Sequence, residues 1–101
     1  MIVRAALSPA CLGETLNAGR GAPEIEVGEL ARIVIDTVGK RLTVAPRPAT
    51  PGSPVRRCPE MKKMEELTGY SAQTTVEEGV RRTYDWYRPM VFDGRERSVA
   101  T

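Results

Sequence analysis

Apolar residues recur at helical spacing in one segment of the first half of the chain. Leu30, Val34 and Val38 stand four positions apart, so they fall on one face of a helix. Gly39 follows directly, and glycine readily adopts the left-handed conformation that ends many helices. This pattern predicts an amphipathic helix from about Gly28 to Val38.

A second helix is predicted at residues 60–68. Met61, Met64 and Leu67 recur there at near three-residue spacing, which places them on one side of a short helix. Gly69 follows as a C-cap glycine.

A third helix is predicted to begin at Thr75, because Thr75 and Glu78 have the spacing of a capping box. It is expected to run to about Arg88 and to be stopped by Pro89. A shorter helical pattern covers residues 1–7.

Two segments are predicted to be short strands, at residues 14–19 and 42–44. The predicted fold class is therefore α+β, a small domain with three main helices and a few short strands. It is expected to span residues 1–89, followed by a frayed tail at 90–101, where no periodicity is visible.

Residues 46–59 form a segment too rich in proline for regular helix or central strand. Its prolines are Pro46, Pro48, Pro51, Pro54 and Pro59. Arg47 stands at one end, and Arg56 and Arg57 stand at the other. Guanidinium groups match phosphate oxygens, and a stiff segment loses less entropy on binding an anion. The segment is predicted to bind phosphate, and the alternative is three solvated surface arginines.

Composition narrows the chemistry further. Histidine is absent, which excludes Ser-His-Asp and Cys-His catalysis and zinc sites that use histidine. Cys11 and Cys58 cannot fill a zinc shell alone, so we expect no metal. A disulfide between them is the alternative to two reduced thiols, and we expect the thiols because no secretory signal is visible. The glycine pair Gly19-x-Gly21 lacks the third glycine of a dinucleotide-binding motif, because Glu24 stands there.

Charge and hydropathy predict the compartment and the partners. The net charge is +2, and basic and acidic residues are evenly mixed, without the basic stripe of a nucleic-acid binder. No apolar run approaches the ~20 residues that span a membrane, and no secretory signal is visible. We therefore expect a cytoplasmic protein that binds neither nucleic acid nor membrane.

Ordered strings along the chain resemble motifs of the extended short-chain dehydrogenases/reductases, the NAD-dependent epimerases, dehydratases and decarboxylases of nucleotide sugars. The strings are GETLNAGRG at 13–21, ELA at 29–31, SPVRRCPEM at 53–61, LTGY at 67–70, TVEEGV at 75–80 and RRTYDWY at 81–87. The resemblance implies that the chain is the C-terminal, substrate-binding portion of such an enzyme and lacks its NAD-binding Rossmann half.

The resemblance also implies where the chemistry lies. The family's catalytic tyrosine precedes a lysine by four positions. The residues four after the three tyrosines here are Thr74, Arg88 and Val91. The chain is therefore expected to have no catalytic residue, to bind no cofactor by itself and to be inactive in isolation, with NAD held by the missing half.

Substrate binding is the role that the resemblance leaves to this chain. The family's arginines on the proline-rich segment contact the diphosphate of a UDP- or dTDP-linked sugar. They correspond to Arg47 and Arg57, with Arg56 as the less certain partner. The alternative is a stand-alone, non-catalytic module that binds a nucleotide or another protein.

Overall fold

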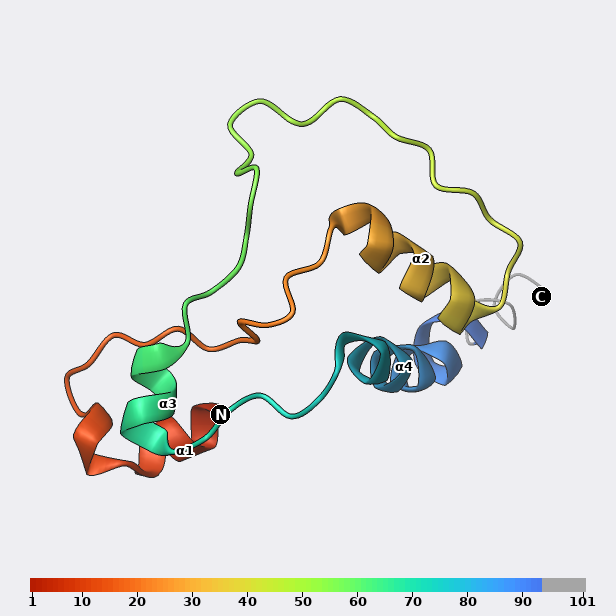
Figure 1. Ribbon diagram of the computed structural model, residues 1–101. Coiled ribbons are helices and arrows are strands. Elements are labelled where there is room, and N and C mark those ends of the chain that lie inside the picture. Colours follow the sequence, from red (N-terminus) through yellow and green to blue (C-terminus); the bar gives the residue numbers. More distant parts are fainter. Residues whose placement is uncertain (94–101) are drawn as a thin grey trace. The chain divides into compact units, whose positions relative to one another are not determined.

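The computed structural model describes residues 1–93, and every regular element in that range is helical (Figure 1). The elements are α1 (Ile2–Leu7), the 3₁₀ turn η1 (Pro9–Cys11), α2 (Val27–Val38), α3 (Lys62–Thr68), α4 (Val76–Tyr87) and the π-helical turn η2 (Arg88–Phe92). The three predicted helices are confirmed, each within about two residues of its expected start and end.

The α+β prediction is wrong, because no strand occurs within residues 1–93. The segments 14–19 and 42–44 are not helical, but neither forms a ladder of backbone hydrogen bonds with another segment in that range. A strand is stable only in a hydrogen-bonded ladder, and its partner is set by tertiary structure rather than by the local pattern. Leu42 and Val44 accordingly remain exposed.

The chain divides into two compact units. Unit 1 consists of Met1–Glu24 and Arg47–Gln73, and unit 2 consists of Ile25–Pro46 and the residues from Thr74 on. Unit 1 therefore contains α1, η1 and α3 together with nearly all of the proline-rich segment. Unit 2 contains α2, α4 and η2.

Unit 1 is built around Met61 and Met64, which are 6% and 2% exposed. They are the only buried residues within 1–93, and both belong to the set of apolar residues at near three-residue spacing that predicted α3. Helices α1 and α3 pack together, and the Ser8 hydroxyl donates to the carbonyl oxygen of Leu67 at 3.2 Å. A salt bridge of 2.6 Å joins the Lys63 ammonium to Glu14.

Unit 2 is a pair of packed helices, α2 and α4, with η2 folded against α4. No residue of either helix is fully buried. Leu30 and Val34 on the apolar side of α2 are 37% and 41% exposed. The predicted amphipathic face of α2 therefore exists, but α4 covers it only in part.

The helix ends follow the predicted signals. Gly39 and Gly69 take left-handed conformations, with φ of 71° and 64°, and cap α2 and α3. The Thr75 hydroxyl accepts a hydrogen bond of 3.2 Å from the backbone N–H of Glu78. The Glu78 carboxylate instead binds Arg82, so the capping box is half formed.

Beyond α4 the backbone continues through the π-helical turn, and Pro89 occupies one of its first positions. Proline has no N–H to donate to the carbonyl oxygen four residues before it, so the α-helical hydrogen-bond pattern of α4 does not continue through Pro89. Of the expected frayed tail at 90–101, residues 94–101 lie outside the described residues.

Candidate functional site

The end of the proline-rich segment docks on residues 17–24 within unit 1. The Asn17 side-chain amide donates to the carbonyl oxygen of Glu60 at 3.0 Å. The Cys58 thiol donates to the carbonyl oxygen of Gly21 at 3.1 Å. These contacts tie the chain around position 58 to the segment that contains the glycine pair.

Gly19 and Gly21 serve this docking by allowing close approach. A Cβ atom at Gly19 would lie 3.0 Å from Cγ of Pro59. One at Gly21 would lie 3.0 Å from the carbonyl oxygen of Pro59 and 3.2 Å from Cγ of Met61. The space beside the glycines is therefore filled by the chain itself. A pyrophosphate cradle needs that space open at a helix N-terminus, so the pair does not fit a dinucleotide.

Arg56 is held by Glu24 in a two-pronged ion pair. The Arg56 Nε–H donates to Oε1 of Glu24 at 2.8 Å, and a terminal N–H donates to Oε2. This hydrogen bonding lowers the pKa of Glu24 below its ordinary 4.5 and raises the pKa of Arg56. The carboxylate is therefore ionised at neutral pH, and the pair is lost only as pH falls through the lowered pKa.

Arg57 and Arg47 are exposed, and neither forms a hydrogen bond or ion pair with any residue in 1–93. Both lie in unit 1. No hydrogen bond or ion pair joins Arg47 to Glu24 or Arg56 at the other end of the segment. The three predicted phosphate ligands thus differ, since Arg56 is paired with Glu24 and the other two have no acidic partner among residues 1–93.

Glu24 is the residue of this site that the sequence did not single out. It stands 32 positions from Arg56, and only the folded chain brings the two together. An acid in a glycine- and proline-containing stretch carries no local signal of an ion pair. The pattern could show the arginines but not which one would be neutralised.

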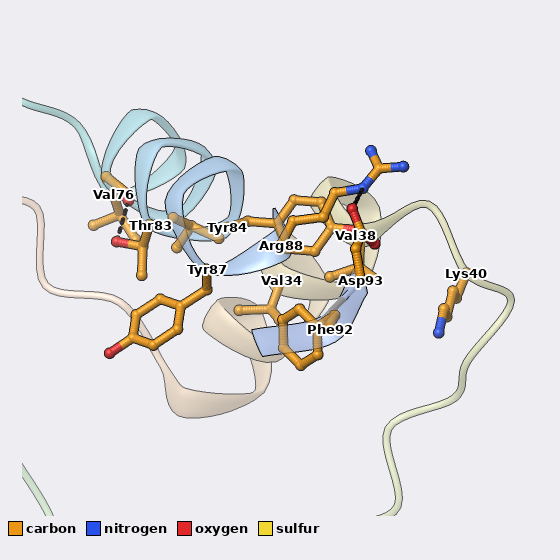
Figure 2. Close-up of a pocket in the computed structure, with 12 residues that line it drawn as sticks. Val34, Val38, Lys40, Val76, Thr83, Tyr84, Tyr87, Arg88, Phe92 and Asp93 are labelled. Carbon is orange, nitrogen blue, oxygen red and sulfur yellow. Dashed lines mark hydrogen bonds and ion pairs between the residues drawn. The ribbon is translucent and has the colours of Figure 1, made fainter. Parts of the chain in front are cut away.

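A second feature lies in unit 2, where α2, α4 and η2 enclose an open, mostly apolar pocket of about 910 Å³ (Figure 2). Its apolar lining is contributed mainly by Val34, Val38, Val76, Val80, Tyr84 and Phe92. The rings of Tyr84 and Phe92 lie 6.4 Å apart between centroids. Arg88 and Asp93 line it too and form an ion pair of 3.8 Å.

The lining of the pocket combines these apolar side chains with the charged side chains of Lys40, Arg88 and Asp93. The rings of Trp86 and Tyr87 in α4 meet edge to face with their centroids 4.8 Å apart, and the two residues are 56% and 45% exposed. No group of three or more cysteine, aspartate or glutamate residues within 1–93 gathers as metal ligands would. None of the helices in that range has the length and apolar character to cross a bilayer.

Comparison with known proteins gives one partial match. The chain is 28% identical over 72 residues to a protein from Escherichia coli O111:H- named "Uncharacterized 37.6 kDa protein in cld 5'region". The match covers 71% of this chain and 21% of the relative, so the chain spans about a fifth of the length of the curated relative it matches. No protein-family profile and no solved structure matches the chain.

Proposed function

We propose that this chain is the substrate-binding portion of a larger NAD-dependent nucleotide-sugar epimerase or dehydratase and that it binds the diphosphate of a UDP- or dTDP-linked sugar. The observation that carries the proposal is the state of Arg57, an exposed guanidinium without a carboxylate partner among the described residues. It stands between Arg56 and Cys58, which are both tied to residues 21–24. An anion would complete the hydrogen bonding of this cation.

The arginines have different roles in this proposal. Arg57 binds the diphosphate directly, because no residue in 1–93 accepts a hydrogen bond from any of its five N–H donors. Arg47 supplies a second, separate cation from the start of the segment. Arg56 contributes less, because Glu24 already accepts two of its donors.

The chemistry of the whole enzyme lies outside this chain in the proposal. Gly19 and Gly21 are packed against Pro59 and Met61, so they leave no cradle for NAD. The tyrosines lack the lysine partner four positions on. NAD would be bound, and the proton transfer carried out, by the part of the enzyme that precedes this one. Similarity to one segment of a 37.6 kDa protein supports a place within a longer chain.

The test is calorimetric titration of UDP into the full chain and into two matched arginine variants. Arg57→Ala removes the proposed ligand, and charge-assisted hydrogen bonds of about 1.5–3 kcal/mol predict binding weaker by about tenfold to a hundredfold. Arg81→Ala removes the same charge from an exposed position of α4 and should change the dissociation constant less than about twofold. Equal effects of the two variants would reduce the proposal to general charge attraction.

A protein-interaction module is the second candidate, favoured by the exposed aromatic side chains of unit 2. Trp86 and Phe92 are 56% and 53% exposed. Exposed aromatic and apolar groups are common at protein interfaces. A cooperative thermal melt without UDP binding, together with capture of a specific protein that Trp86→Ala abolishes, would favour this function over the first.

A further inference from the structure

We propose that Glu24 is a positioning residue: by holding Arg56 in an ion pair, it directs Arg57 alone toward the diphosphate. This inference rests on the proposed function, because it concerns how the same site selects its ligand group. Two neighbouring arginines on a chain without regular structure would otherwise compete for one anion in several arrangements. Because Glu24 occupies Arg56, the arrangement that remains is the one in which Arg57 binds the anion.

The first support is the bidentate ion pair between Glu24 and Arg56. Each oxygen of the Glu24 carboxylate accepts from a different nitrogen of Arg56, and no hydrogen bond or ion pair joins Glu24 to Arg57. A bidentate pair also fixes the guanidinium plane, which a single contact would not do. Arg57 therefore has no acidic partner among residues 1–93, although the residue before it is ion-paired.

The second support is the anchoring on both sides of Arg57. Position 56 is tied to Glu24, and position 58 is tied to the carbonyl oxygen of Gly21. The next residue, Pro59, lies against both glycines. Anchors at the preceding and following residues restrict the backbone that carries Arg57, so less entropy is lost when its side chain grips an anion.

The direction in which one substitution changes the affinity for UDP distinguishes this inference from simple charge attraction. Glu24→Gln removes a negative charge near the proposed anion site, and charge attraction alone predicts tighter UDP binding. The inference predicts weaker binding, because Arg56 is released and the chain around Arg57 loses one anchor. The expected loss is about three- to tenfold in affinity, the cost of ordering one long side chain and its backbone.

The experiment follows the arginine Nε–H resonances of the ¹⁵N-labelled full chain while UDP is added. We expect the Arg57 signal to move and the Arg56 signal to stay, because Arg56 Nε–H remains on Glu24. This measurement needs no variant. An Arg56 signal that moves as far as that of Arg57 would overturn the inference, because Arg56 would then have left Glu24 for the phosphate.

The variants complete the test. Glu24→Gln should weaken UDP binding, and Glu29→Gln, which removes the same charge from an exposed position of α2, should not. The exchange Glu24→Arg with Arg56→Glu restores the ion pair in reverse and should restore the affinity to within about twofold. Unchanged or tighter UDP binding by the Glu24→Gln variant contradicts the inference. So does a double variant that binds UDP no more tightly than the Glu24→Gln variant.

Failure of the proposed function has a different signature. If UDP moves no resonance in the unaltered, folded chain, both proposals fall. If UDP binds and Arg57→Ala abolishes binding while Glu24→Gln leaves it unchanged, the diphosphate site stands and the role of Glu24 falls.

Discussion

At the scale of single residues, the strongest constraint is the close approach of Gly21 to the chain that carries the arginines. Its position leaves 3.0 Å between a Cβ atom and the carbonyl oxygen of Pro59, a backbone atom that cannot turn aside. The sequence showed a glycine pair without the third glycine of a dinucleotide-binding motif. The reason for the glycine is packing against residues 59–61, which lie far along the chain and become neighbours only on folding.

This contact gives a prediction with a matched control. Gly21→Ala should lower the free energy of unfolding by about 1–3 kcal/mol, because overpacking forces the backbone of Pro59 or the side chain of Met61 to move. Gly28→Ala places a methyl group in open space within α2 and should raise it by about 0.5–1 kcal/mol. Urea denaturation of both variants checks this, and equal changes would contradict the packing account.

At the scale of elements, the helices could be predicted because their signals are local. The left-handed glycine after α2, the one after α3 and the threonine before α4 all stand where the pattern put them. Whether the predicted strands would form could not be decided, because a short apolar run at residues 42–44 is equally compatible with an unpaired segment. Strand pairing is decided by partners elsewhere in the molecule.

The contribution of the N-cap of α4 to stability can be measured with a single substitution. Thr75→Ala removes the acceptor of the Glu78 N–H and should cost about 1 kcal/mol of stability, with less helical signal in circular dichroism. Thr43→Ala alters an exposed threonine outside the regular elements and should have no such effect. If the two variants lose the same amount of helix, the cap does not stabilise α4.

At the scale of the whole molecule, the described chain has little buried apolar surface. Met61 and Met64 alone are buried within residues 1–93, and several large apolar side chains of both units are exposed. The methionine spacing could be recognised from the sequence. The small amount of buried apolar surface could not be predicted, because helical periodicity shows which face is apolar but not what lies against it.

A core this small makes each of its members important. Met64→Ala should destabilise unit 1 by about 2–5 kcal/mol and abolish a cooperative thermal transition, because marginal domains have little stability to lose. Met90→Ala, at a position 62% exposed, should change the melting temperature little. A Met64→Ala chain that melts like the unaltered chain would show that stability resides elsewhere.

The account as a whole depends on Arg57 and its neighbours forming a site for a nucleoside diphosphate. An amide ¹H–¹⁵N spectrum of the full chain, recorded as UDP is added, tests this most directly. We predict dispersed signals with shifts confined to residues around 19–24, 47 and 56–58. A dispersed spectrum that UDP leaves unchanged, or shifts confined to α2 and α4, would contradict it.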